Sequence, residues 1–421
     1  MVSCAEAGAP DLRQGRQQAP HRDLEQGRRQ SGEDIVSANI GMVAGEASGD
    51  LLAAAVLEAL RGREAAAGVH GLRTAGIGGP AMASRGFDRW WPSELLAVHG
   101  YAAALKVYPK LLAIRHGLAR RLQQWPAQAF VGVDAPDFNL GLETRLRAAG
   151  VRTLHFVSPS IWAWRRERIE KIRKAVDRML LVFPFEEALY REAGIPAIYC
   201  GHPLADQIPM QPDRAAARER LGLAPHDTVV AVLPGSRAGE VAHIAPIFRD
   251  TIILLAQANP GWRFVIPAAG VERERQLQEL LAGREFDADV RLIQGQAHVA
   301  LAACDITLIA SGTATLEAAL FKRPMVIAYR MAGLSYRLMK GRGYLPYVGL
   351  PNILSGEFVV PEYIQDAATP VALADAVRRQ LDDTAGNERL AARFAELHRQ
   401  LACGCAERVA DAIAAELEVA R

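Results

Sequence analysis

The strongest constraint on the fold is the alternation, from Ile40 onward, of short apolar runs with longer amphipathic ones. A first series of buried-strand candidates comprises NIGMVA (39–44), AFVGVD (129–134), RTLHFVS (152–158) and RMLLVFP (178–184). A second series follows a pause at residues 199–209 and comprises DTVVAVLPGSR, WRFVIPAA, VRLIQG, DITLIASGT and RPMVIAYR. Strands that alternate with helices form parallel sheets with right-handed crossovers. We therefore predict an α/β protein of two Rossmann-like domains whose parallel sheets face each other across a cleft.

The sequence divides into four segments. Residues 1–37 are polar and lack apolar periodicity, which predicts a disordered tail without the apolar core of a secretory signal. Residues 38–205 and 206–370 hold the two strand series, and residues 371–421 form helices expected to pack across both domains. The helix GDLLAAAVLEALRG is expected to end at Gly62. Nowhere do 18 uncharged apolar residues run together, so no transmembrane helix is predicted.

Composition and motifs narrow the class of protein. Half of the 421 residues are hydrophobic, which allows a large core, and the net charge of +2 provides no general attraction for nucleic acid. Five scattered cysteines fit a reducing compartment. The sequence contains neither G-x-x-x-x-G-K-[ST] nor G-x-G-x-x-G, which argues against an ATPase and a dehydrogenase.

The loop LPGSR (233–237) is the first candidate for binding a nucleotide diphosphate. Ligands of open α/β sheets bind beyond the carboxyl ends of the strands, and this loop directly follows a predicted strand. Gly235 lets the backbone approach a ligand closely, and Ser236 follows it. Arg237 offers a bidentate fork to a diphosphate, although a salt-bridged surface arginine is the alternative.

The stretch SGTATLE (311–317) is a stronger nucleotide signal. Ser311, Gly312 and Thr313 lie between a strand and a helix, where a hydroxyl caps the helix and the free N–H groups attract an anion. Glu317 follows one turn later and is able to accept hydrogen bonds from ribose hydroxyls. A plain capping box is the alternative interpretation.

Two further polar positions in the second domain are open to more than one interpretation. Asn352 ends the loop LPYVGLPN. Its side chain either binds the base or a phosphate of the nucleotide, or serves only to form the turn. Asp287 and Asp289 resemble a metal-binding carboxylate pair, but they precede a strand, which favours a solvated turn. We therefore expect a site that needs no metal and no cofactor, with Arg237 and the helix end neutralising a leaving diphosphate.

In the first domain, DAPDFN (134–139) places two carboxylates at the end of a strand. Asp134 is well placed as a general base, whereas Asp137 suits the role of helix cap. Ser158 follows the next strand, in the stretch VSPSIWAWR. Both stretches therefore belong to the predicted cleft.

Residues 90–121 are apolar and aromatic, with interspersed basic residues. Such a basic amphipathic stretch lies at a membrane surface in some proteins, whereas core-facing helices are the alternative. The candidate docking residues are Trp90, Trp91, Lys106, Lys110 and Arg115.

Seven motifs in order together resemble the lipid-A-disaccharide synthases, which form glycosyltransferase family 19 and have the GT-B fold. The resemblance covers about residues 38–415 and rests on AGEASGD (44–50), DAPDFN (134–139), VSPSIWAWR (157–165), GHPLAD (201–206), LPGSR (233–237), SGTATLE (311–317) and LPNIL (350–354). It implies a reaction in lipid A biosynthesis. UDP-2,3-diacylglucosamine and 2,3-diacylglucosamine 1-phosphate (lipid X) give the β(1→6) disaccharide 1-phosphate and UDP.

The resemblance also implies roles for the loops. An α-linked donor that gives a β-linked product is inverted, so one base is needed, which is Asp134 or Asp137. The second domain would hold UDP, and the first would face the acyl-sugars through Glu46, Ser48, Asp50 and Ser158. Asp50 as a helix cap is the alternative.

The implied location is the cytoplasm, with peripheral attachment to the cytoplasmic face of the inner membrane, and the implied assembly is a homodimer through the C-terminal region. No nucleic-acid partner is expected. The rival hypotheses are a UDP-GlcNAc 2-epimerase or another UDP-sugar enzyme of the same fold, and a non-catalytic module that binds nucleotide-sugar or lipid.

Overall fold

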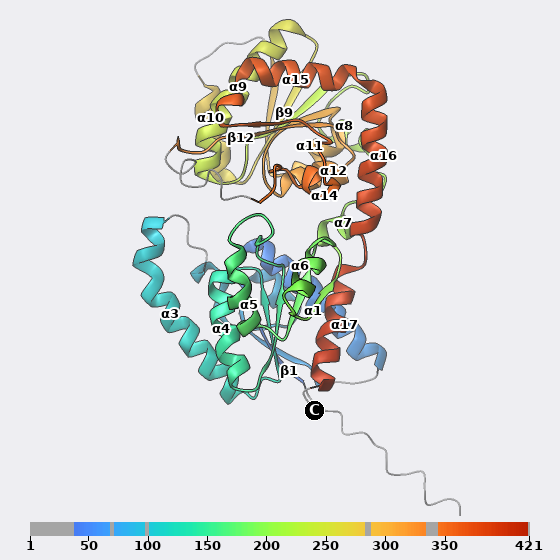
Figure 1. The fold of residues 1–421 in the computed structure, drawn as a ribbon. Coiled ribbons are helices and arrows are strands. Elements are labelled where there is room, and N and C mark those ends of the chain that lie inside the picture. Colours follow the sequence, from blue (N-terminus) through green and yellow to red (C-terminus); the bar gives the residue numbers. More distant parts are fainter. Residues whose placement is uncertain (1–37, 68–70, 97–100, 283–287, 334–343, 420–421) are drawn as a thin grey trace, which may run out of the picture. The chain divides into compact units, whose positions relative to one another are not determined.

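The computed structural model describes residues 38–67, 71–96, 101–282, 288–333 and 344–419 (Figure 1). Contacts group residues 37–421 into one compact unit. The predicted tail, residues 1–37, lies outside the described residues, and so does Asp287.

Within the described residues, the first sheet has seven parallel strands in the order β3-β2-β1-β4-β5-β6-β7. The strands are β1 (Asn39–Ala44), β2 (Arg73–Gly78), β3 (Asp88–Pro92), β4 (Ala129–Val133), β5 (Arg152–Phe156), β6 (Arg178–Leu181) and β7 (Ala197–Tyr199). The order reverses direction between β1 and β4, which lie side by side. This is the doubly wound order of Rossmann-type sheets.

The second sheet repeats the same order with six parallel strands, β10-β9-β8-β11-β12-β13. The strands are β8 (Val229–Leu233), β9 (Arg263–Ala268), β10 (Asp289–Gln294), β11 (Ile306–Ala310), β12 (Met325–Tyr329) and β13 (Glu362–Ile364). Its reversal lies between β8 and β11. The prediction of two Rossmann-like parallel sheets is confirmed.

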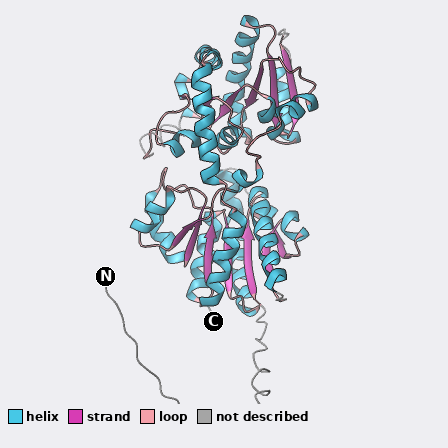
Figure 2. Cartoon of the chain, turned by 90° about the vertical axis from the view of Figure 1, so that its right-hand side faces the viewer, coloured by secondary structure: helices cyan, strands magenta, loops and turns pink. Residues whose placement is uncertain are grey.

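Helices cover both faces of each sheet (Figure 2). In the first half of the chain they are α1 (Ala47–Ala67), α2 (Pro80–Ser84), α3 (Tyr101–Gln124), α4 (Pro136–Ala148), α5 (Ile169–Ala175), α6 (Glu186–Glu192), α7 (Pro203–Gln207) and α8 (Arg214–Arg220). In the second half they are α9 (Ala238–Ala258), α10 (Val271–Leu281), α11 (Ala297–Ala303), α12 (Ala314–Leu320), α14 (Leu350–Ser355), α15 (Pro370–Asp382), α16 (Thr384–Leu401) and α17 (Cys405–Val419). Three short 3₁₀ helices are Ser93–Leu95, Arg166–Arg168 and Gln365–Ala367.

Alternate residues of each strand enter different buried clusters. Met42 and Val131 pack in the cluster that contains Leu57 of α1, whereas Val43 and Phe130 pack in the cluster of α3 and α4. Because both faces of a parallel sheet are buried, its strands are apolar throughout. This burial explains why the apolar runs were visible in the sequence.

The last helix returns to the first sheet. Helix α15 packs on the second sheet, whereas α17 packs on α1, β4 and β5 (Figure 1). The carboxylate of Glu416 in α17 is almost fully buried and accepts from Arg178 Nε at 2.6 Å and from Arg152 Nε at 3.0 Å. Arg63 of α1 donates from Nη1 to Glu407 Oε2 at 2.6 Å. These ion pairs connect α17 to α1 and to strands β5 and β6 of the first sheet.

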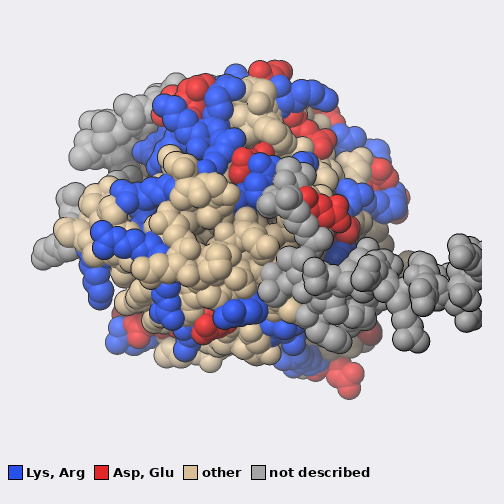
Figure 3. All heavy atoms as spheres, turned by 90° about the horizontal axis from the view of Figure 1, so that it is seen from below, with Lys and Arg blue, Asp and Glu red and all other residues tan. Residues whose placement is uncertain are grey.

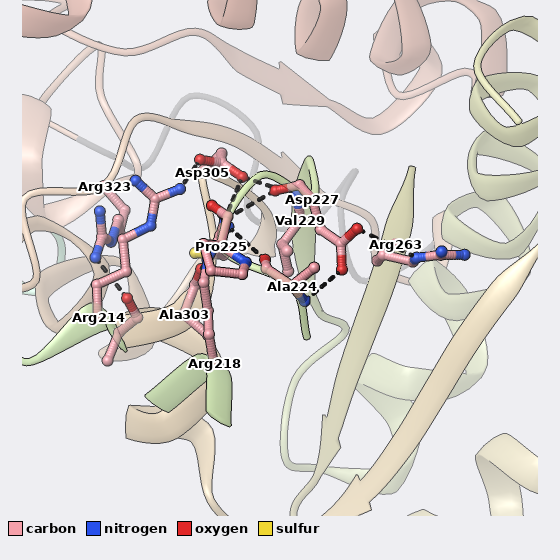
Figure 4. Close-up of polar contacts among 12 residues, drawn as sticks. Arg214, Arg218, Ala224, Pro225, Asp227, Val229, Arg263, Ala303, Asp305 and Arg323 are labelled. Atoms are coloured by element: carbon pink, nitrogen blue, oxygen red, sulfur yellow. Dashed lines mark hydrogen bonds and ion pairs between the residues drawn. The ribbon is translucent and has the colours of Figure 1, made fainter. Parts of the chain in front are cut away.

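An arginine cluster in which Arg218 is buried ties together the amino ends of β8 and β11 (Figure 4). Arg218 donates to the Ala303 carbonyl at 3.0 Å and to Asp305 Oδ2 at 2.9 Å. The same oxygen accepts the Val229 N–H at 2.8 Å, and Arg214 also pairs with Asp305. Ligands of parallel sheets bind at the opposite, carboxyl ends. We therefore assign this cluster a structural role.

The strand predictions and the observed strands differ in informative places. Every predicted strand is present, but β2, β3, β7 and β13 were not among the predicted runs. Three of these are edge strands, and β2 is glycine-rich. Gly76 in β2 has φ +146°, and a Cβ there would lie 2.1 Å from the Met42 carbonyl oxygen, so this strand requires glycine. Helix α1 continues through Gly62 to Ala67, which corrects its predicted end.

Helix α9 is long and apolar enough to cross a membrane by length and composition alone. Half of its most apolar window is buried in the protein, where Ile244, Phe248 and Ile252 pack in the core of the second sheet. Its turns also carry Glu240 and Asp250. These features are those of a core helix.

Gly132 in β4 provides a test of the packing under the first sheet. A Cβ at this position would lie 2.1 Å from Glu143 Oε1 and 2.9 Å from Asn139 Cβ. We predict that Gly132→Ala lowers the free energy of unfolding by about 1–3 kcal/mol, because the added methyl group overlaps fully buried Glu143 and Asn139. Urea unfolding measures the change. Gly62→Ala is the control, since its Cβ meets open space in a helix and should add about 0.5–1 kcal/mol. Equal stability of Gly132→Ala and the parent protein would contradict this packing.

Candidate functional site

The motifs found in the sequence follow the strands at both sheet reversals. Residues 44–50 and 134–139 follow β1 and β4, and residues 233–237 and 311–317 follow β8 and β11. A Cβ on Gly45 would lie 2.9 Å from Ala135 Cβ, so the first two loops are in close contact. Ligands of doubly wound sheets bind at these reversals. The fold therefore gathers the motifs into two loop pairs, one on each sheet.

Asp134 lies in a strained turn at the tip of β4. Asp134 and Ala135 have φ of 50° and 43°, a left-handed conformation that non-glycine residues rarely adopt. The turn is held by the Asp134 N–H, which donates to the Phe156 carbonyl at 2.9 Å, and by Asn139 Nδ2, which donates to the Asp134 carbonyl at 2.8 Å. Among the described residues, none hydrogen-bonds the Asp134 carboxylate. The strain thus presents a half-exposed carboxylate at the sheet reversal.

Asp137 has a different environment. It lies in the first turn of α4, its side chain is 82% exposed, and its Oδ1 accepts from Arg168 Nη2 at 2.9 Å. An exposed, ion-paired carboxylate is less suited to proton abstraction than an unpaired one at a strand tip. The geometry favours Asp134 as the base.

The loop after β1 contains one structural carboxylate and two exposed polar residues. Asp50 is 4% exposed, and its oxygens accept the N–H groups of Gly79, Ala81 and Met82 at 2.8, 2.8 and 3.1 Å. Asp50 therefore caps the start of α2, which corrects its assignment as a sugar ligand. Glu46 and Ser48 are exposed at the sheet reversal.

Ser158 is also used internally. It is 7% exposed, and its Oγ lies 2.8 Å from the Tyr190 hydroxyl and donates to the Pro159 carbonyl at 3.0 Å. The assignment of Ser158 as an acceptor ligand is therefore corrected, because its hydroxyl is buried and already bonded.

A buried carboxyl that sequence reasoning missed lies in the same region. Glu186 begins α6 and is 1% exposed, and its Oε2 accepts the Phe183 N–H at 3.1 Å. Its Oε1 has no partner among the described residues. Burial raises the pKa of the Glu186 carboxyl to about 7. The phenylalanines and acids of FPFEE, directly after β6, were the available signal.

Aromatic rings and one histidine pack together around the loop FPFEE, which carries this carboxyl. Trp162 packs edge-on against Phe185 at 5.3 Å between ring centroids, and Phe183 stacks on Phe185 at 5.6 Å. His202 of the GHPLAD motif packs against Phe183, and burial lowers the pKa of His202 to about 4. Loops after β5, β6 and β7 thus share one packed cluster at the edge of the first sheet.

The loop after β8 places its arginine at the surface. Gly235 has φ +105°, which favours glycine, and Ser236 is exposed. The Arg237 side chain is 72% exposed, and its Nη1 donates to Glu240 Oε1 at 3.1 Å. The structure therefore contains the predicted alternative, a surface ion pair. The guanidinium is nevertheless exposed beside the sheet reversal.

The loop after β11 is braced by the glycine- and proline-rich loop. Ser311 Oγ donates to the Val348 carbonyl at 2.9 Å, and the Leu350 N–H donates to Thr315 Oγ1 at 3.3 Å. Gly312 and Thr313 are exposed. The Thr313 side chain makes no capping hydrogen bond, which corrects the expected helix cap.

Glu317 has a partner that sequence reasoning did not identify. His298 Nε2 lies 2.9 Å from Glu317 Oε2. His298 comes from the first turn of α11, after β10, in a stretch QGQAHVA without a recognisable motif. The pairing places the imidazole of His298 beside Glu317, the residue predicted to bind ribose.

Asn352 is a structural residue. It is fully buried, its Nδ2 donates to the Val360 carbonyl and to Glu362 Oε1, and its Oδ1 accepts the N–H groups of Val359 and Val360. All four hydrogen-bonding positions of the amide are occupied. The assignment of Asn352 as a nucleotide ligand is therefore corrected.

The proposed docking stretch is only partly exposed. Trp90 and Trp91 on β3 are half-buried, and the Arg121 guanidinium covers Trp90 at 4.1 Å from the ring centroid. Arg115 packs toward α4, because a Cβ on Gly141 would lie 2.4 Å from its Nη1. Trp90, Trp91 and Arg115 are therefore only partly exposed, and their role as docking residues stays a prediction.

The remaining candidates, Lys106 and Lys110, lie in the first half of α3. Lys110 is exposed, and so is the nearby Tyr108, at 56%, which was not among the candidate docking residues. The side chain of Lys106 lies outside the described residues.

Solved structures with this fold include a UDP-GlcNAc 2-epimerase and a glycosyltransferase. UDP-GlcNAc 2-epimerase from Neisseria meningitidis, solved bound to UDP-GlcNAc, superposes with a TM-score of 0.60 at 12% identity and covers 88% of this chain and 98% of that chain. The calicheamicin glycosyltransferase CalG4 superposes with a TM-score of 0.57 at 16% identity, covering 91% and 99%. At these identities the likeness defines the fold alone, which is GT-B.

Sequence comparison identifies the family. The profile described as lipid-A-disaccharide synthetase matches residues 40–413. Lipid-A-disaccharide synthase of Azoarcus sp. (strain BH72) is 52% identical over 379 residues, which are 90% of this chain and 96% of that protein. The same enzyme of Paraburkholderia phymatum is 52% identical over 382 residues, 91% and 97%. The chain belongs to the lipid-A-disaccharide synthetase family and is a glycosyltransferase.

The buried Glu186 makes stability depend on pH. Its carboxyl ionises near pH 4.5 when the chain unfolds but only near pH 7 in the fold, so the free energy of unfolding falls as pH rises between these values. We predict that Glu186→Gln becomes more stable relative to the parent protein across this window, by on the order of 3 kcal/mol in total. Urea unfolding at pH 5 and pH 8 measures the change. Glu192→Gln, on an exposed position of the same helix, controls for the loss of one carboxyl. A stability difference that does not vary with pH would contradict the buried, protonated state.

Proposed function

We propose that this protein joins UDP-2,3-diacylglucosamine to 2,3-diacylglucosamine 1-phosphate, giving the β(1→6) lipid A disaccharide 1-phosphate and UDP. The observation that supports this best is the carboxylate of Asp134, which accepts no hydrogen bond from the described residues and is held by a strained turn at a sheet reversal in a chain of this family. The acceptor hydroxyl attacks the anomeric carbon of the donor sugar while the bond between that carbon and the diphosphate oxygen of UDP breaks. The configuration inverts in one step, so one base suffices, and Asp134 takes the hydroxyl proton.

The second sheet supplies the nucleotide side of the proposal. Gly235 and Ser236 after β8 and Gly312 and Thr313 after β11 offer backbone N–H groups beside exposed Arg237. A guanidinium and backbone donors stabilise the negative charge that develops on a leaving diphosphate. Ser311 shapes this loop through Val348, and Glu317 accepts from ribose hydroxyls. The site is expected to work without a metal ion.

The first sheet supplies the acyl-sugar side. Glu46 and Ser48 are exposed in the loop that touches Ala135, next to Asp134. Their oxygens suit hydrogen bonds to sugar hydroxyls and amides. An epimerase of the same fold is not favoured, because the family match and the 52% identity point to the disaccharide synthase.

The base assignment is tested by removing one carboxylate at a time. We predict that Asp134→Asn lowers turnover at least about a hundredfold, because the attacking hydroxyl loses its proton acceptor, while UDP affinity persists. UDP release with diacylglucosamine 1-phosphate as acceptor, with and without EDTA, measures turnover, and calorimetry measures UDP binding. Asp137→Asn is the matched control and should retain turnover within a few-fold, since Asp137 is exposed and paired with Arg168. Normal turnover in Asp134→Asn would remove this residue from the mechanism.

We further propose that the protein binds the cytoplasmic face of the inner membrane peripherally through the start of α3. Both proposed substrates carry acyl chains embedded in a bilayer. Tyr108 and Lys110 provide an exposed aromatic ring and an exposed cation there, which is the pairing used at membrane interfaces. Lys106 precedes them in sequence. Analytical ultracentrifugation of the purified protein tests the homodimer that the family resemblance implies.

Basic charge is not confined to α3, so the membrane test needs a control. Lys and Arg side chains surround an uncharged area on the face shown in Figure 3. We predict that Tyr108→Ser combined with Lys110→Ala reduces co-sedimentation with anionic vesicles several-fold, since an exposed ring and a cation are lost together. Val371→Ser with Arg389→Ala removes an exposed apolar side chain from α15 and an exposed cation from α16 and should partition like the parent protein. Equal partitioning of all three proteins would reject α3 as the docking surface.

A further inference from the structure

His298 reaches the reversal of the second sheet from the far edge of that sheet. Strand β10 lies at the edge, and the chain then turns through Gly295 and Gln296, with φ of 63° and 56°, into α11. Helix α11 crosses back over β9 and β8 and contacts α12. Its inner residues, Ala300 and Leu301, are fully buried, whereas His298 is half-exposed at the start of the helix.

The contact with Glu317 leaves part of that carboxylate free. His298 Nε2 lies 2.9 Å from Glu317 Oε2, and the imidazole packs on Phe321 with 5.3 Å between ring centroids. Among the described residues, no hydrogen bond is made to Glu317 Oε1. One oxygen is thus held by the histidine, and the other is available one turn after the exposed loop Gly312–Thr313.

The charge of the pair reinforces the contact. The hydrogen bond to Glu317 raises the pKa of the His298 imidazole, although partial burial opposes the shift. Among the described residues, Glu317 of α12 is the titratable group that faces His298, and Phe321 of the same helix is uncharged. The imidazolium therefore persists to higher pH than in a free histidine.

We infer that His298 is a positioning residue that holds Glu317 so that its second oxygen accepts a hydrogen bond from a ribose hydroxyl, which makes the pair select ribonucleotides over deoxyribonucleotides. The inference rests on the proposed function, because it requires uridine diphosphate at this loop. A long carboxylate side chain with free rotamers loses conformational entropy when it binds. A histidine that fixes one oxygen reduces that loss before the ligand arrives.

The expected selectivity follows from the cost of leaving a carboxylate without its donor. A hydrogen bond to a charged group contributes enough that removal of the ribose hydroxyl should weaken binding by roughly tenfold to a hundredfold. Two other roles for His298 predict different binding results. A direct contact to the diphosphate would affect all nucleotides equally, and a mere brace between α11 and α12 would affect folding but not selectivity.

Calorimetric titration with UDP, 2′-deoxy-UDP and 3′-deoxy-UDP distinguishes these roles. For the parent protein we expect at least one deoxynucleotide to bind roughly tenfold or more weakly than UDP. In His298→Ala this ratio should fall several-fold, because Glu317 is no longer held, and in Glu317→Ala it should fall to within about threefold of unity. The double variant should be no worse than Glu317→Ala, because both residues act through one hydrogen bond. His298→Gln, which retains an N–H donor, should recover most of the ratio.

Two results would overturn the inference. A His298→Ala protein that binds all three nucleotides more weakly by one common factor, or that keeps the parent ratio, removes His298 from the selection of ribose. Failure of the parent protein to bind UDP would instead defeat the proposed function, and the inference with it. The midpoint of thermal unfolding, measured for each variant, separates loss of selectivity from loss of fold.

The pH dependence gives an independent readout. In the parent protein the ratio of deoxynucleotide to UDP dissociation constants should decrease as pH rises through the raised pKa of His298, because the charge that holds Glu317 is lost. In His298→Gln the ratio should not change with pH. The same pH dependence in both proteins would assign the titration to another group and contradict the role of His298.

Discussion

Burial of both faces of two parallel sheets is the constraint on which the rest of this structure depends. Helices on each face leave the strand ends as the places where polar loops reach solvent. Both sheets have the same doubly wound order, so each has one reversal, at β1 and β4 and at β8 and β11. Every loop that carries a residue proposed to bind substrate follows one of these four strands. Burial of both sheet faces therefore explains both the apolar core and the position of the site loops.

Polar residues near the reversals divide into those that build the loops and those that remain available to a ligand. The hydrogen bonds of Asp50 all go to backbone N–H groups, and those of Asn352 go to three backbone groups and the Glu362 carboxylate. Buried polar groups must be paired in this way, because an unpaired one costs free energy. Glu46, Asp134 and Arg237 remain exposed or half-exposed beside them. The strained turn at Asp134 is stabilised by buried Asn139, which donates a hydrogen bond to the Asp134 carbonyl.

Much of the fold was predictable, because apolar runs and their spacing are local properties of a sequence. The nine predicted strands are all present, but glycine-rich β2 and the short edge strands were missed, since their pairing depends on neighbours and not on their own composition. Within the site, LPGSR and SGTATLE were found from their position after strands. His298 was not found, because the short stretch QGQAHVA carries no periodic or spacing signal, and Glu186 was missed although the acids of FPFEE closely follow a predicted strand.

The amino-acid sequence by itself determined the strand–helix alternation, the two-domain parallel architecture and the loops that carry the motifs, because hydrophobic periodicity and glycine placement act over a few residues. Only the tertiary structure decided which polar residues of those loops serve as braces and which face solvent. It also decided the partners of Glu317 and Asp137, His298 and Arg168, which are 19 and 31 residues distant in sequence. Such pairings depend on how helices from separate crossovers meet, and no local pattern records that.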